Sequence, residues 1–373
     1  MALIPGITGS RCCAAPRPVR PASHGLATLI TAFAMLMSMP GAVSAKPVTA
    51  LDKPIATAVT AIPIDFDRDD PTRKQFGKLT FRGGLNLYAK SSHFGGFSGL
   101  AIDPSGESIL AVSDAGTWML ADLDYNGRHL KGLRNVALGP VLGAGGKPLR
   151  SETERDSEAL GLASGDTRKG SAYVGFERKH GIGIYPFSAN SFGPPQGAVQ
   201  VPAGAKRMRS NQGIEALAPI RSGRLKGTLV AFSERLTGKD GNLQGWLIGG
   251  PTPGPILLKR LAGFDITDAA SLPDGGIVIL ERRFRYSEGV QMRIRRVAQS
   301  ELKPGALIKG EVLLEANDSY NIDNMEAIAA HRAAAGETVI TLMSDDNFSP
   351  LQRTLIIQFA LPDGPLLAGP RVD

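Results

Sequence analysis

Carboxylate side chains recur at two fixed places in a motif that this sequence repeats five times. The first place opens a strand-like segment, and the aligned positions there are Ser98, Glu158, Glu215, Asp268 and Glu326. The second place ends the next apolar run, and its acids are Asp114, Glu177, Glu234, Glu281 and Asp345, with Asp346 beside the last. Carboxylates gathered in space can bind a hard cation such as Ca²⁺ or take a proton from water. These acids are therefore the first candidates for chemistry.

The spacing of these positions indicates a structural repeat. Successive opening positions lie 60, 57, 53 and 58 residues apart, and the opening residue precedes its acid by 19 residues in three of the repeats. Four-stranded propeller blades recur at about 40 to 50 residues, apart from longer loops. Further strand-like runs follow inside the repeats, for example at residues 183–187, 243–248 and 291–297. The sequence therefore predicts an all-β propeller of four-stranded blades.

The predicted number of blades depends on how the ring closes. The fifth repeat provides three strand-like runs, at residues 324–328, 339–345 and 354–360, and lacks a fourth. Residues 78–88 near the N-terminus can supply that strand and close the ring, which removes the free sheet edges. This closure predicts five blades. Six blades are the alternative, although residues 46–96 are few and irregular for a further unit.

A ring of this kind brings the repeated acids to one mouth, because the start of an innermost strand and the end of its antiparallel neighbour lie at the same face. We assign catalytic roles to Glu158, Glu215 and Glu326, and metal binding to Asp114, Glu177, Glu234, Glu281, Asp345 and Asp346. Three arginines that follow acids are assigned to binding an anion, namely Arg178, Arg235 and Arg282. Crowded carboxylates need such compensation, and guanidinium groups match phosphate and carboxylate alike. The alternative for each acid is a structural role, bonded to turn amides or to a neighbouring arginine.

The N-terminal segment has the pattern of a secretory signal. A stretch with three arginines precedes an apolar run at residues 26–39, and the small residues Val43-Ser44-Ala45 follow as a cleavage site. The apolar run is shorter than the ~20 residues of a spanning helix, so we expect no membrane span. Export to the periplasm or secretion is predicted, with cleavage near Ala45. Three regions result: a signal peptide at 1–45, an N-terminal extension at 46–76 and the propeller domain at 77–373.

Cysteine content and charge exclude several classes of function. Both cysteines, Cys12 and Cys13, lie in the predicted signal, so the mature chain has no disulfide, thiolate nucleophile or cysteine metal site. The formal net charge is +7 for the whole chain, and it falls to +4 when the three arginines of the signal are removed (7 − 3). No basic cluster interleaved with aromatic residues is present, so we expect no nucleic-acid partner. A monomer that acts on a small anionic ester is expected instead.

Several segments resemble the phytase-like family, whose name refers to an esterase-like activity of phytase. The resemblance rests on Ser113-Asp114 with Gly116, Asp156-Ser157-Glu158, residues 211–217, Leu280-Glu281-Arg282, Asn324-Met325-Glu326 and residues 344–348. It extends from about Gly95 to Leu361, and the last two motifs are the most specific. The resemblance implies a propeller fold with esterase-like or phosphoester-hydrolysing activity, and it leaves the substrate open.

The residues favour metal-assisted hydrolysis over a serine triad. A serine hydrolase needs Gly-x-Ser-x-Gly in a strand-to-helix turn, and the nearest stretch, Gly96-Phe97-Ser98-Gly99, has the wrong register. We therefore expect Ca²⁺-assisted hydrolysis of a phosphoester, in which a carboxylate activates water and the arginines hold the anion. Two alternatives stay open: a metal-dependent lactonase or carboxylesterase, and a non-enzymatic periplasmic binding or scaffold propeller with structural calcium.

Overall fold

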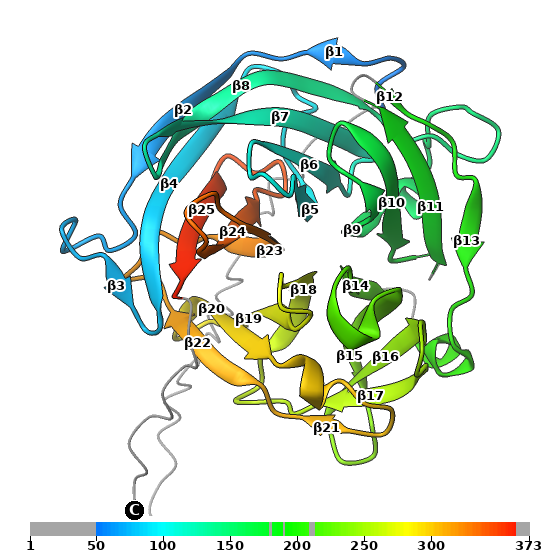
Figure 1. The fold of residues 1–373 in the computed structure, drawn as a ribbon. Helices are drawn as coiled ribbons and strands as arrows, with labels where there is room; N and C mark the ends of the chain where they lie inside the picture. Colours follow the sequence, from blue (N-terminus) through cyan, green and yellow to red (C-terminus); the bar gives the residue numbers. More distant parts are fainter. Residues whose placement is uncertain (1–49, 179–180, 189–190, 209–212, 363–373) are drawn as a thin grey trace, which may run out of the picture. The chain divides into compact units, whose positions relative to one another are not determined.

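Five antiparallel sheets stand in a ring around a central axis (Figure 1). The computed structural model describes residues 50–178, 181–188, 191–208 and 213–362. Within these ranges the innermost strands of the five sheets contact one another in a closed cycle. The predicted all-β propeller is confirmed, with five blades rather than six. The predicted signal peptide at 1–45 lies outside the described residues, and no helix in the described part is long and apolar enough to cross a membrane.

Each blade is built on strands that follow one another in the chain, and in blades one, three and five strands from elsewhere in the chain are added at the outer edge. Blade one holds β5 (Phe97–Ile102), β6 (Ser108–Ser113), β7 (Thr117–Asn126) and β8 (His129–Pro140), and β1 (Ile55–Ala56) pairs with β8. Blade two holds β9 (Ser157–Gly165), β10 (Lys169–Phe176) and β11 (Gly181–Ser188), with β12 (Ser191–Phe192) and β13 (Gly197–Val199) both on β11. Blade three holds β14 (Ile214–Pro219), β15 (Thr228–Thr237), β16 (Leu243–Gly249), β17 (Gly254–Leu258) and β21 (Leu307–Ile308).

The last two blades follow the same order. Blade four holds β18 (Asp265–Ser271), β19 (Ile277–Arg285), β20 (Gly289–Val297) and β22 (Glu311–Ala316). Blade five holds β23 (Asn324–Arg332), β24 (Thr338–Asp345), β25 (Thr354–Leu361), β4 (Leu79–Ala89) and β2 (Val59–Ile64), and β3 (Gln75–Phe76) pairs with β4. In the described parts of the chain, the connections contain one short helix, α1 (Glu152–Arg155), and three 3₁₀ turns, η1 (Ala203–Arg207), η2 (Gly223–Leu225) and η3 (Gln299–Glu301).

The N-terminal strand β4 closes the ring, as the sequence predicts. It pairs antiparallel with β25, so a strand from the start of the chain completes the blade built from its end. Its buried residues include Leu85, which is inaccessible to solvent and packs in the core between blades five and one. Strands β1, β2 and β3, which lie in the predicted extension at 46–76, add to blades one and five. Strand β2 in turn pairs with β4 and forms the outer edge of blade five.

The hydrophobic core consists of five clusters, one between each pair of neighbouring blades. A blade is therefore covered on both faces, and the second strands β6 and β24 are buried at every residue. Burial on both faces explains why these strands read as continuous apolar runs instead of alternating patterns. The polar residues that the repeats place at the ends of such runs are thus the ones that can reach the axis.

Candidate active site

Every innermost strand carries one extra residue near its start. In each blade the pairing of the first strand with the second is interrupted at one point near the start of the first strand. There, one residue of the first strand lies between two successive pairs and has no partner on the second strand. These residues are Ser98, Glu158, Glu215, Thr267 and Glu326. Such a β-bulge bends the strand and turns a side chain to a new direction, and bulges are common beside active sites. All five bulge residues line one cavity of about 170 Å³, which we call the mouth cavity.

The mouth cavity is acidic. Among the described residues, seven carboxylates line it: Asp114, Glu158, Glu177, Glu215, Glu234, Glu326 and Asp345. Its other lining residues are Ser98, Ile266, Thr267, Arg282 and Asn347. The structure thus brings together the three predicted catalytic glutamates, four of the six predicted metal ligands and one of the three predicted arginines. The expected convergence of the repeats on one mouth is seen for blades one, two, three and five.

Blade four differs, because its sequence repeat is shifted by one residue from the predicted alignment. Its bulge residue is Thr267, which lies between the pairs Ile266–Glu281 and Asp268–Leu280. Asp268 is instead fully buried, and its carboxylate accepts hydrogen bonds from the backbone N–H groups of Ala269 at 2.7 Å and Ile328 at 2.8 Å. It therefore links blade four to blade five.

The same shift moves Glu281 away from the mouth cavity. Glu281 lies opposite Ile266, a position that Ser113, Ser233 and Ser344 occupy in other blades. Its side chain is inaccessible to solvent, bonds to Arg295 and lies 3.6 Å from Nη1 of Arg293. Where the other blades place an acid in the lining of the cavity, blade four places Arg282. The predicted metal ligand Glu281 is therefore not placed with the other acids.

Asp346 also lies outside the lining of the mouth cavity, because its oxygens are engaged by the backbone of the loop. Oδ1 accepts hydrogen bonds from the N–H groups of Gly96 and Phe348, both at 3.0 Å, and Oδ2 accepts one from Thr354 Oγ1 at 2.9 Å. Phe348 and its neighbour Asn347 adopt positive φ angles of 50° and 48°, which non-glycine residues rarely do. Asp346 thus holds a strained turn that places Asn347 in the lining.

Asp346→Ala is expected to lower the free energy of unfolding by about 1–3 kcal/mol, because three bonds to the turn are lost. The measurement is urea unfolding in calcium-free buffer. A free energy of unfolding equal to that of the wild-type protein would contradict this structural role of Asp346.

The three predicted anion-binding arginines all contact carboxylates. Arg282 Nη1 lies 2.9 Å from Glu326 Oε1 across the mouth cavity. Arg178 Nε lies 2.8 Å from Asp156 Oδ2, and Arg235 Nη2 lies 2.9 Å from Glu234 Oε1. Arg178 and Arg235 are partly exposed and do not belong to the lining. Only Arg282, among the described lining residues, offers a positive charge to a bound anion.

Burial and mutual repulsion raise the pKa values of the carboxylates of the cavity. Burial raises the pKa of Asp114 to about 6, with a further rise from the charge of Asp156. Burial raises the pKa of Glu326 to about 7 against the opposing effect of Arg282, and burial with Asp156 raises the pKa of Glu177 to about 7. The pKa values of Glu158, Glu215 and Asp345 are raised well above the ordinary value, first by burial and then by neighbouring acids. Protons or a bound cation must therefore compensate this cluster.

One group of acids is spaced so that it could hold a metal ion. Asp156, Glu158 and Glu177 each offer a carboxylate oxygen, and these oxygens lie within 4.8 Å of one another. An all-oxygen donor set suits a hard cation such as Ca²⁺ or Mg²⁺. Asp156 was not among the residues predicted from the sequence to act at the site, although it lies two positions before Glu158 in a motif singled out there. His180, which follows Glu177 in the chain, and residues 211–212, which precede Glu215, lie outside the described residues.

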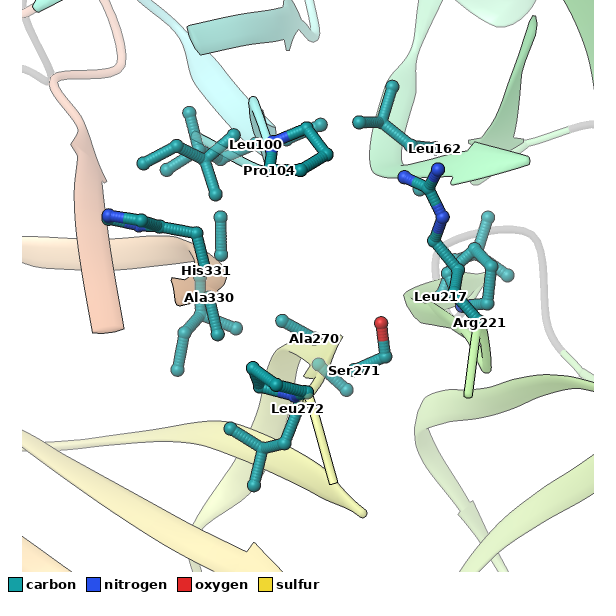
Figure 2. A pocket seen from close by; sticks show the side chains of 18 of the residues that line it. Leu100, Pro104, Leu162, Leu217, Arg221, Ala270, Ser271, Leu272, Ala330 and His331 are labelled. Carbon is teal, nitrogen blue, oxygen red and sulfur yellow. The ribbon is translucent and has the colours of Figure 1, made fainter. Parts of the chain in front are cut away.

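A second cavity, of about 340 Å³, lies at the other end of the inner strands (Figure 2). Its lining includes Leu100, Leu160, Leu217, Ala269 and Ile328, and each of these follows a bulge residue by two positions. These side chains form an apolar layer that separates the acidic mouth cavity from the second cavity. This layer contributes to the burial of the carboxylates at the mouth. No carboxylate belongs to the described lining of the second cavity.

The fold and the site together define a five-bladed propeller with an acid-lined mouth. A family model described as Phytase-like, esterase-like activity of phytase, matches residues 92–348. The chain belongs to this family, as the resemblance of its motifs predicts. Membership indicates esterase-like or phosphoester-hydrolysing activity. A comparison with curated proteins found no match.

Proposed function

We propose that this protein hydrolyses a phosphoester at the mouth cavity with the help of a bound divalent cation, Ca²⁺ in the first instance. The single observation that supports this most is that seven described carboxylates, whose pKa values are raised, converge on one cavity. The family match supports an esterase-like activity. The N-terminal sequence pattern further supports action after export, with cleavage near Ala45. We further propose that the protein acts as a monomer.

In this proposal Asp156, Glu158 and Glu177 hold the cation, because their oxygens are already close enough to share one ion. Glu158 thereby moves from a catalytic role, as predicted from the sequence, to a ligand role. Asp114, Glu234 and Asp345 complete the acidic surroundings. A cation bound there would polarise a phosphoryl oxygen and lower the pKa of water.

Glu326 is the proposed general base. Its pKa of about 7 is suited to taking a proton from water near neutral pH, where a base works best if its pKa matches the working pH. Arg282, 2.9 Å from Glu326, is the proposed partner of the substrate anion. The Thr267 hydroxyl and Glu215 lie on the same cavity and would orient the water and the substrate.

The test is a panel of a phosphomonoester, a phosphodiester and a short acyl ester, each assayed with EDTA and again after Ca²⁺ is restored. Phosphoester turnover that disappears in EDTA and returns with Ca²⁺ is the expected result. Glu326→Gln should lower kcat by about 10²–10⁴-fold, the usual contribution of a general base. Glu107→Gln, an exposed change on the β5–β6 turn, is the matched control and should leave kcat unchanged.

Other outcomes favour the alternatives. Turnover of the acyl ester alone would indicate a metal-dependent lactonase or carboxylesterase, because such substrates lack the phosphate that Arg282 would bind. No turnover of any ester, with Ca²⁺ raising only the melting temperature, would indicate a binding or scaffold propeller. The pairing of Arg282 with Glu326 gives that last alternative its support, since the mouth cavity then prefers cations over anions.

A further inference from the structure

The hairpin between β19 and β20 extends beyond the mouth end of blade four. Pairing between β18 and β19 stops at Asp265–Arg282, where Arg282 lines the mouth cavity. Pairing between β19 and β20 continues to Arg285–Gly289 without irregularity. The hairpin therefore stands above the inner strand, next to the opening of the site.

This hairpin exposes aromatic side chains. Phe284 is 66% exposed and Tyr286, in the turn, is 100% exposed. The connection between β24 and β25, which carries the lining residue Asn347, adds Leu351 at 87% exposed. Six large hydrophobic residues are strongly exposed among those described, and three of them lie in the β19–β20 hairpin or in the β24–β25 connection. Apolar side chains gathered beside a site typically mark a binding surface.

Phe284 shares a face of the hairpin with Arg282, because side chains two positions apart in a strand point the same way. Phe284 is paired with Val290, which packs on the core between blades four and five. Arg282 contacts Glu326 of blade five from that same face. The Phe284 ring therefore comes next after the Arg282 guanidinium on this face, in the direction that leads outward from the mouth cavity.

Ion pairs hold the hairpin in shape. Glu288 accepts hydrogen bonds from Arg283 at 2.7 Å, Arg285 at 2.9 Å and Gln291 at 3.0 Å. The Arg283 guanidinium also lies 4.8 Å from the centre of the Phe264 ring. A surface that is already ordered loses less entropy when a ligand binds to it. These contacts order the hairpin that carries Phe284 and Tyr286.

We propose that Phe284 and Tyr286 form a subsite for an apolar group of the substrate. This inference rests on the proposed function, and it narrows the substrate class to anionic esters that carry an aryl or alkyl group. The charge of the mouth cavity agrees: its described lining sets Arg282 against seven carboxylates, which accommodates one anionic group far better than a densely charged polyanion. The apolar part of such an ester would extend outward onto the hairpin.

The test compares two substrates with the same reacting group, ethyl phosphate and 4-phenylbutyl phosphate, in the presence of Ca²⁺. Wild-type protein should prefer the phenylbutyl ester by about tenfold or more in kcat/KM, as expected when an aromatic ring is buried. The double change Phe284→Ala with Tyr286→Ala should remove that preference and leave ethyl phosphate unaffected. Tyr88→Ala and Leu307→Ala, exposed hydrophobic changes on β4 and β21, are the matched controls. A preference that survives the double change, or that the controls lose equally, overturns the subsite.

A binding measurement separates this inference from the proposed function. If neither phosphate is hydrolysed, the hydrolase proposal fails, and calorimetry with ethylphosphonate and 4-phenylbutylphosphonate in Ca²⁺ decides on the subsite. Tighter binding of the phenylbutyl compound that is lost in the double variant supports it. Equal binding of the two compounds to wild-type protein refutes it.

Discussion

Calcium-free protein should lose thermal stability as the pH rises from 5 to 8, and added Ca²⁺ should restore it most strongly at pH 8. The reason is the raised pKa of the acids at the mouth, about 6 for Asp114 and about 7 for Glu177 and Glu326. In the unfolded chain these groups have ordinary pKa values near 4. Between those limits the folded protein binds more protons, so its free energy of unfolding falls as the pH rises.

The size of this effect follows from the shifts. One pKa unit corresponds to about 1.4 kcal/mol, and the partial exposure of Glu177 reduces its contribution. Together these acids should lower the free energy of unfolding by several kcal/mol between pH 5 and 8. Each kcal/mol corresponds to roughly 1.5 °C in melting temperature for a chain of this size. Calorimetry at pH 5, 6, 7 and 8, with EDTA and with Ca²⁺, measures it. Carboxylate ligands must be deprotonated to bind a metal, so Ca²⁺ should stabilise the protein little at pH 5.

Matched variants show whether the mouth causes this dependence. Glu326→Gln combined with Glu177→Gln should flatten the decline in melting temperature, because two of the groups with raised pKa values no longer titrate. Glu107→Gln, which is exposed on the β5–β6 turn, should leave it unchanged. A melting temperature that is constant or rises from pH 5 to 8 in EDTA would contradict the raised pKa values.

The sequence was sufficient to predict the propeller, its five blades and the closure by a strand near residues 78–88, because both faces of each blade are buried. Such burial leaves a repeated apolar run with polar residues at its ends, and this pattern survives in a single sequence. Glu158, Glu215 and Glu326 were found in the same way, since each precedes a small residue and then an aliphatic one. In this order the glutamate is the bulge residue, and the aliphatic residue two positions later belongs to the apolar layer beneath the mouth cavity.

The fourth repeat was misaligned because it imitates this order one position late. Asp268-Ala269 looks like the Glu-Ala pairs of the other repeats, but Thr267 is the bulge residue. An alignment that searches for acids therefore selects Asp268 and then Glu281, and both are buried away from the mouth. Ion pairs between strands, such as that of Glu281 with Arg295, depend on how the strands pair and cannot be predicted from residues that are adjacent in the sequence.

Arg295→Met is expected to lower the free energy of unfolding by about 3–5 kcal/mol, because it leaves the carboxylate of Glu281 buried without its main partner. Neither side chain of this pair is accessible to solvent. Arg295 also donates to the carbonyl oxygens of Lys259 at 3.0 Å and Lys309 at 2.9 Å. Arg296→Met, which breaks an exposed pair with Asp274 one residue later, is the matched control and should cost less than about 1 kcal/mol.

The double change Glu281→Leu with Arg295→Met should recover at least half of that loss, because an apolar pair of similar volume leaves no buried charge. Urea unfolding measures the stabilities, and calorimetry measures Ca²⁺ affinity. Burial raises the pKa of Glu281 and Arg295 opposes the rise, so Glu281→Gln should lower stability while Ca²⁺ affinity stays unchanged. Glu158→Gln should weaken Ca²⁺ binding without lowering stability, since the Glu158 carboxylate lies close to the carboxylate oxygens of Asp156 and Glu177. If Glu281→Gln weakened Ca²⁺ binding as much as Glu158→Gln, Glu281 would be a metal ligand after all, and the one-residue shift in blade four would not hold in solution.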